Sequence, residues 1–174
     1  MGIFTKKNKN GDRSVNLTFI DGIPGYVKGT AIALSIERDT NYLTIRPRVH
    51  KHLPEVSIDM ERLVGVTVAS EKEILEKEKD KSVIGRAAIG GVLLGPLGAI
   101  VGGMSGIGTK TKSKTKSKNY IIINYKSLDN ELKILSFEIV GASLHWTSFV
   151  EELNRIILPK EEEKEIIKED KIFL

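Results

Sequence analysis

The stretch from residue 56 to residue 66 reads VSIDMERLVGV, and its spacing indicates the fold class. Val56, Ile58 and Met60 occupy every second position, with polar side chains between them. After a short break, valines resume the same spacing. Apolar residues that alternate with polar ones place one face of a strand against a core and leave the other face in water. The stretch therefore predicts two half-buried strands of an antiparallel sheet.

The same alternation continues on both sides of this stretch. Turn-forming residues separate neighbouring runs, as in the DGIPG loop at residues 21–25. We expect seven strands in all, at residues 15–20, 31–36, 42–46, 56–60, 64–68, 120–125 and 132–139. The residues expected to face the core from the first three strands are Val15, Leu17, Phe19, Ile32, Leu34, Ile36, Leu43 and Ile45.

A helix is expected after the last strand, because the apolar residues there change to helical spacing. Ser148 and Glu151 fit the S-x-x-E capping box, although Ser143 offers an earlier start. We expect Pro159 to end this helix. The last residues hold four lysines and six acids, which predicts a short solvated helix or a mobile tail. The apolar residues of the helix are Trp146, Phe149, Val150, Leu153, Ile156 and Ile157.

Seven strands followed by one amphipathic helix is the element order of the pleckstrin-homology (PH) fold. Residues 56–66 and the helix start WTSFV at residues 146–150 carry the resemblance. The chain resembles bacterial PH-like domains, in which a helix plugs one end of a bent barrel. The resemblance implies a mainly β fold of the α+β type, a PH-like bent antiparallel barrel of about seven strands capped by a C-terminal amphipathic helix. An SH3-like or lipocalin-like barrel is the structural alternative.

The 174 residues suffice for one domain of ordinary size, and 40% apolar residues suffice for a core. An insertion between strands five and six interrupts the barrel. It begins with a densely charged stretch at residues 71–81 that predicts a helix. We divide the chain into a flexible N-terminus (1–14), the barrel with its helix (15–69 and 119–158), the insertion (70–118) and a charged tail (159–174).

The middle of the insertion carries no charge over the 21 residues 87–107, and nine of the sixteen glycines lie between Gly85 and Gly108. Glycine weakens an isolated helix by about 1 kcal/mol per residue, whereas glycines four apart let helices pack closely. The pattern therefore predicts a glycine zipper that a bilayer or a close neighbour stabilises. The expected helix-packing residues are Gly91, Gly95, Gly98, Gly102 and Gly106.

A single membrane crossing by this segment is disfavoured. Gly95 and Pro96 interrupt its middle, and a barrel built from both flanks keeps the two ends on one side. We expect a helical hairpin with arms near 84–94 and 97–107, each about 16 Å long and too short to cross. It would be a shallow re-entrant hairpin or pack against copies of itself. The expected apolar contacts are Ile89, Val92, Leu93, Leu94, Leu97, Ile100 and Val101.

A run of alternating lysines follows the uncharged segment. The chain has a net charge of +4, and without these five lysines the remainder would carry −1, so the basic charge is local. A polybasic cluster beside an apolar segment attracts anionic lipid headgroups, by about 1 kcal/mol per basic residue. A solvated flexible linker is the alternative interpretation. The expected headgroup ligands are Lys110, Lys112, Lys114, Lys116 and Lys118.

No catalytic, metal or cofactor site can be recognised from the sequence. The chain has no cysteine, which excludes thiolate chemistry and disulfides. His50 and His52 share the spacing of a strand face, but the pattern fixes no third ligand. The glycine run lacks the residue order of a phosphate-binding loop. We expect a protein that is not an enzyme and that uses no cofactor.

Two further ligand classes are disfavoured. Eukaryotic PH relatives often bind inositol phosphates through basic residues around the first hairpin, but the loop at residues 21–25 has none, and Lys28 is the nearest. Aromatic residues make up only 6% of the chain, and the lysine run contains none, so we expect no specific nucleic-acid binding.

The leading hypothesis is a non-catalytic PH-like interaction module that associates with an anionic membrane surface, with copies of itself, or with both, through its glycine zipper. A soluble homo-oligomeric protein-binding scaffold with the glycine-rich arms at the subunit interface is one alternative, and a membrane-disrupting oligomer is another. A protein or peptide partner on the barrel stays open. The basic N-terminus has no apolar segment after it, so we expect a cytoplasmic protein that works at the inner face of the membrane.

Overall fold

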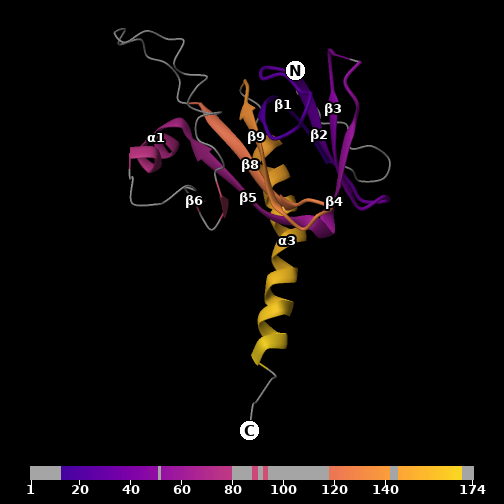
Figure 1. Ribbon diagram of the computed structural model, residues 1–174, viewed down its shortest axis with the longest axis vertical. Coiled ribbons are helices and arrows are strands. Elements are labelled where there is room, and N and C mark those ends of the chain that lie inside the picture. Colours follow the sequence, from indigo (N-terminus) through magenta and orange to yellow (C-terminus); the bar gives the residue numbers. More distant parts are fainter. Residues whose placement is uncertain are drawn as a thin grey trace.

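The computed structural model describes residues 13–50, 52–79, 88–89, 92–93, 118–141 and 145–169 (Figure 1). Seven antiparallel strands form one sheet in the order β4-β3-β2-β1-β9-β8-β5. Their bounds are β1 Arg13–Asp21, β2 Ala31–Glu37, β3 Tyr42–Pro47, β4 Val56–Asp59, β5 Leu63–Ser70, β8 Asn119–Lys126 and β9 Leu132–Ile139. The other elements are a 3-10 turn η1 (Met60–Arg62), α1 (Glu71–Lys79), β6 (Ala88–Ile89), β7 (Val92–Leu93) and α3 (His145–Glu169).

The seven predicted strands are all present, and they belong to one folding unit. Strand β5 pairs with β8 so that Ala69 lies opposite Tyr120 and Ser70 opposite Asn119. The blocks before and after the insertion therefore share a sheet, as the sequence predicts. The amide of Glu71 also donates to the carbonyl of Lys118 at 2.8 Å. Both ends of the insertion thus leave the sheet side by side.

The main core lies on the inner face of the sheet, and it includes the inward residues that the period-two pattern predicts for β1, β2 and β3. Every predicted inward residue of β1, β2 and β3 is at most 3% exposed. The ring of Phe19 packs edge-on against Tyr26 and Phe137, with centroids 5.3 Å and 6.2 Å apart. Because all seven strands contribute to this one cluster, the sheet curves around it.

Helix α3 closes the core, packing against β1, β5 and η1. Its residues Phe149, Leu153 and Ile157 are buried in the main core. The guanidinium of Arg13 donates to the carbonyl of Ser148 at 3.0 Å, and Arg38 forms an ion pair with Glu152. These contacts hold the first half of α3, and its second half continues beyond the sheet (Figure 1).

The predicted capping box at Ser148 and the predicted end of this helix at Pro159 were both wrong. The hydroxyl of Ser148 donates to the carbonyl of His145 at 3.1 Å, so Ser148 lies inside the first turn and forms no capping box. Ser143 lies outside the described residues. The helix also passes through Pro159 to Glu169. A proline costs a helix about 3 kcal/mol, but here packing fixes the preceding turns, and strong helix formers, mostly Glu and Lys, follow it.

The predicted charged helix in the insertion is present as α1, but the predicted helical arm at 84–94 was wrong where the structure describes it. There, β6 and β7 pair as antiparallel strands, with Ala88 opposite Leu93 and Ile89 opposite Val92. The two residues between them in the sequence are both glycine, a pair favoured between hairpin strands and poor in helices. The predicted second arm at 97–107 lies outside the described residues.

Candidate functional site

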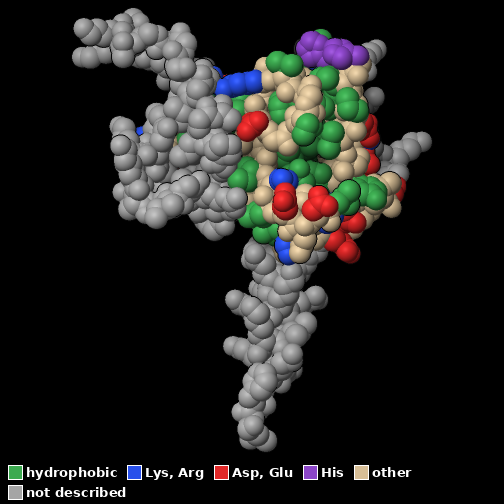
Figure 2. Space-filling model, in the orientation of Figure 1, with side chains coloured by type: hydrophobic (Ala, Val, Ile, Leu, Met, Phe, Trp, Pro, Cys, Tyr) green, Lys and Arg blue, Asp and Glu red, His purple; other side chains and the backbone are tan. Residues whose placement is uncertain are grey.

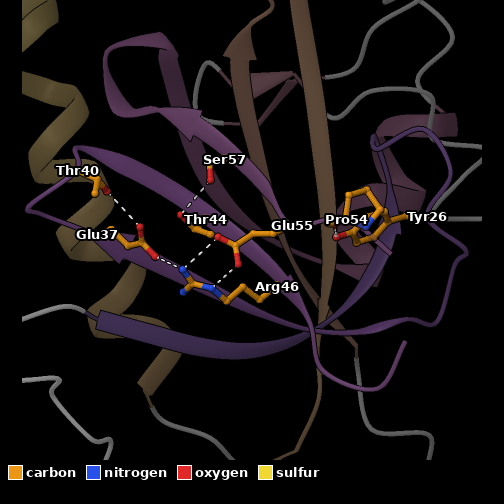
Figure 3. Close-up of polar contacts among 8 residues, drawn as sticks. All are labelled: Tyr26, Glu37, Thr40, Thr44, Arg46, Pro54, Glu55 and Ser57. Carbon is orange, nitrogen blue, oxygen red and sulfur yellow. Dashed lines mark hydrogen bonds and ion pairs between the residues drawn. The ribbon is translucent and has the colours of Figure 1, made fainter. Parts of the chain in front are cut away.

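The outer surface of the sheet has two halves of opposite character. On β2, β3 and β4 it carries polar side chains that contact one another (Figure 3). Arg46 bridges two carboxylates, donating from Nε to Glu55 at 2.6 Å and pairing with Glu37. The hydroxyl oxygens of Thr44 and Ser57 lie 3.4 Å apart, within hydrogen-bond distance. Burial alone would raise the pKa of Glu37, but hydrogen bonds from Arg46 and its threonine neighbours lower it. The charged side chains of this half, Arg46, Glu37 and Glu55, are thus paired with one another.

The other half of the outer surface is apolar and fully covered. Four residues on β1, β5 and β8 point away from the main core, yet each is at most 6% exposed. They form what we call the outer apolar face, which consists of Ile20, Ala69, Tyr120 and Ile122. Strand β8 is therefore buried on both faces, because Ile121 and Ile123 point into the main core.

Parts of the insertion lie against this half of the sheet. Helix α1 packs against β5 and buries the side chain of Ile74 completely. Strand β7 lies against both β5 and β8. Figure 1 shows α1 and β6 on the flank of β5, away from β2 and β3. The outer apolar face is thus a second, smaller core between the sheet and the insertion.

The base of the insertion is held by a dense set of polar contacts. The carboxylate of Glu73 accepts from the amide and the hydroxyl of Ser70, both at 2.7 Å, and the amide of Glu73 donates back to that hydroxyl at 3.3 Å. This reciprocal pair is a capping box for α1, and its hydrogen bonds lower the pKa of Glu73. Sequence reasoning missed it, although Ser70 and Glu73 stand at the S-x-x-E spacing.

Two residues on the other side of the base complete it. Lys118, the last lysine of the run, forms an ion pair with Glu138 on β9 at 3.1 Å. Tyr120 is buried beside this pair. Burial, together with the carboxylates of Glu138 and Glu71, raises the pKa of Tyr120 to about 12. The ionised form of this phenol is therefore disfavoured both by burial and by the two nearby carboxylates.

Few of the residues predicted to act in the insertion lie in the described part of the chain. Ile89 belongs to β6, and Val92 and Leu93 belong to β7. Lys118 precedes β8 and is half exposed. The remaining predicted residues lie outside the described residues and stay predictions, namely Gly91, Gly95, Gly98, Gly102, Gly106, Leu94, Leu97, Ile100, Val101, Lys110, Lys112, Lys114 and Lys116.

The histidine pair lies apart from this region. The exposed rings of His50 and His52 meet edge to face, with centroids 5.6 Å apart, and histidines gather at one end of the visible surface (Figure 2). Glu55, the nearest acid in sequence, is paired with Arg46. Across the described ranges, no group of three or more acidic or histidine side chains is placed to hold a metal ion.

The first loop is fixed by its own packing. The hydroxyl of Tyr26 donates to the carbonyl of Pro54 at 2.6 Å, which ties the β1–β2 loop to the β3–β4 loop. Gly22 has a φ of +111°, and a Cβ there would lie 2.1 Å from the carbonyl oxygen of Ile134. The loop is therefore pressed against β9, and Lys28 is its basic residue.

Comparison with known families agrees with this architecture. The model of the family described as "Glycine zipper containing PH domain" matches residues 25–139, which is more than half of the chain. The chain belongs to this family. The match runs from the β1–β2 loop to the end of β9 and includes the whole insertion, so the resemblance to PH-like domains with a glycine zipper is confirmed.

Two other findings bear on this PH domain. No curated protein matches the chain. In the portion that the structure describes, no helix has both the length and the apolar character needed to span a bilayer.

Proposed function

We propose that this PH domain is a non-catalytic interaction module that associates with an anionic membrane surface through its glycine-zipper segment. The observation that carries the proposal is the pairing of Ser70 with Asn119, because it brings both ends of the insertion to one point. A segment tethered at one point can enter a lipid surface only as a loop. The uncharged residues 87–107 supply the apolar part of that loop.

The lysine run supplies the second attraction that peripheral binding requires. One apolar contact alone gives marginal, reversible binding, and a polybasic cluster makes it stable. Lys118 is engaged by Glu138, so Lys110, Lys112, Lys114 and Lys116 would contact the headgroups. At about 1 kcal/mol each, four lysines would strengthen binding to anionic membranes several hundredfold. The protein would then work at the inner face of the membrane from the cytoplasm.

Flotation with liposomes tests this function. We expect the full chain to float with phosphatidylserine-containing vesicles, less with neutral vesicles, and not at all after deletion of residues 87–107. A variant with serine at the four lysines is the matched control, and it should lose the preference for anionic lipid while keeping the apolar segment. Binding that survives both changes would contradict the proposal.

Self-association is the second candidate function, and it is compatible with one contact inside the chain. Strand β7 rests on β5 and β8, so part of the segment packs on protein rather than on lipid. A soluble homo-oligomer would bury the remaining glycine-rich surface between copies, which a monomer would expose at a cost. The mass in solution without detergent, measured by light scattering, distinguishes the two. An oligomer that also releases dye from vesicles would be the membrane-disrupting form.

A further inference from the structure

We infer that the outer apolar face is a docking site for the paired strands β6 and β7, which we call the hairpin, and that release of this hairpin controls whether the glycine-zipper segment is available. The second part of this inference rests on the proposed function. The outer apolar face lies on the side of the sheet that would otherwise meet water, yet Ile122 and Ala69 are fully buried and Tyr120 is 2% exposed. A covered apolar face on the outside of a sheet needs an occupant.

The occupant comes from the same chain. Strand β7 lies against both β5 and β8, the two strands that carry Ala69, Tyr120 and Ile122. Helix α1 covers the neighbouring part of β5 and adds Ile74. Strand β6 pairs with β7. All four of their residues, Ala88, Ile89, Val92 and Leu93, are apolar, so the composition of the pair suits an apolar face.

The two parts of this cover are held with different strength. Helix α1 is fixed by the Ser70–Glu73 capping box and by the bond from the amide of Glu71 to Lys118. Strands β6 and β7 have two residues each. An isolated two-stranded hairpin is at best marginally stable in water, so this one depends on the face beneath it. The hairpin is therefore the part that can leave while α1 and the sheet stay folded.

Docking and membrane binding would then compete for the same apolar residues. In the docked state, Val92 and Leu93 belong to β7, the strand that lies against β5 and β8. In the released state they join the rest of the uncharged segment, and the outer apolar face is open. A change that weakens docking should therefore raise membrane association, since a ligand shifts an equilibrium toward the state that it binds better.

Hydrogen exchange on the full chain tests the docking step. We expect the amides of residues 88–93 to be protected in the wild type. Ile122→Ser should reduce that protection about tenfold or more, because it removes most of a buried side chain beneath the hairpin. Thr67→Ser is the matched control, since Thr67 lies directly opposite Ile122 on β5 and loses a single methyl group. Amides of β1, β2 and β3 report whether the sheet is intact.

A second variant tests the docking step independently if Ile122→Ser does not fold. Ala69→Gln adds a polar side chain to the outer apolar face without removing any core atom, and it should release the hairpin in the same way. Unprotected amides at 88–93 in the wild type, or protection kept in both variants, would overturn the docking inference.

Flotation of the same variants tests whether release of the hairpin controls membrane binding. Increased binding of Ile122→Ser or Ala69→Gln to anionic vesicles supports it, and unchanged binding despite lost protection overturns it. If neither the wild type nor the released variants float, the proposed membrane function fails, and the exchange result still decides whether the hairpin docks.

Discussion

Gly22 begins the loop between β1 and β2, and its backbone leaves no room for a side chain. Its φ is +111°, and a Cβ would lie 2.1 Å from the carbonyl oxygen of Ile134. Gly25 also has a positive φ, +83°, but a Cβ added there would meet no other atom within 4 Å. Gly25 is therefore needed only for its positive φ, whereas Gly22 is needed both for its positive φ and because a side chain would overlap β9.

We expect Gly22→Ala to lower the free energy of unfolding by at least about 3 kcal/mol, because strain and overlap with β9 add together. Gly25→Ala should cost only about 1 kcal/mol, which is the penalty for a left-handed conformation alone. Urea unfolding of both variants measures the difference. Equal losses in the free energy of unfolding would show that the contact between the loop and β9 does not contribute to stability.

Arg46 gives a prediction on pH dependence. Its hydrogen bond helps keep the pKa of Glu37 below the usual value. A folded-state pKa below the unfolded one contributes stability above the unfolded pKa, and that stability is lost as the pH falls through the folded pKa. We expect Arg46→Met to lose at most about 1 kcal/mol at pH 7, since the pair is partly exposed. The deficit should narrow as the pH falls below the ordinary glutamate pKa of about 4.3. Thr40→Ala, which removes a weaker hydrogen bond to Glu37, should lose less. Urea unfolding at a series of pH values measures both deficits, and a deficit that grows toward low pH would contradict this account.

Among the elements, α1 depends most clearly on its first turn. Its sequence is densely charged, so the capping box and Ile74 are its main attachments to the sheet. Ser70→Ala should destabilise α1 by about 1 kcal/mol and speed amide exchange in its first turns. Lys72→Ala, which breaks an exposed pair with Glu76, is the control and should change exchange little. Equal exchange in the two variants would exclude a capping role for Ser70.

Sequence reasoning predicted the strands well because each has one face in the main core, and the period-two pattern records that face directly. It failed at the hairpin of β6 and β7, where glycine spacing suits either a close-packed helix or a turn between strands. The second core left a signal that was overlooked. Residues 120–123 read YIII, a continuous apolar run that indicates a strand buried on both faces.

For the candidate site, sequence patterns located the insertion and its charge but not its contacts. The ion pair of Lys118 with Glu138 and the hydrogen bond of Glu71 to Lys118 join residues that are distant in sequence. No local spacing encodes such pairs. The end of α3 was misjudged for a related reason, because packing of Phe149 and Leu153 stabilises a helix that the local effect of Pro159 alone would end.

At the scale of the whole molecule, the sheet should fold without the uncharged segment. Deletion of residues 87–107 removes both strands of the hairpin while leaving all seven strands of the main sheet. We expect the variant to unfold cooperatively and to bind the dye ANS more strongly than the wild type, because the outer apolar face is uncovered. Adding Ile122→Ser to the deletion should reduce the dye signal again. Unchanged dye binding on deletion would mean that other parts of the chain cover this face.

The adjacency of Ser70 and Asn119 also bears on how such a domain can vary. Paired residues in an antiparallel sheet have Cα atoms only about 5 Å apart, so a tight turn fits at this junction as well as a long segment does. The entropic cost of closing a loop rises by only about 0.6 kcal/mol for each doubling of its length. The junction is therefore a tolerant insertion site. Related proteins could carry segments of very different length there, and segments could be exchanged by design without changes to the sheet.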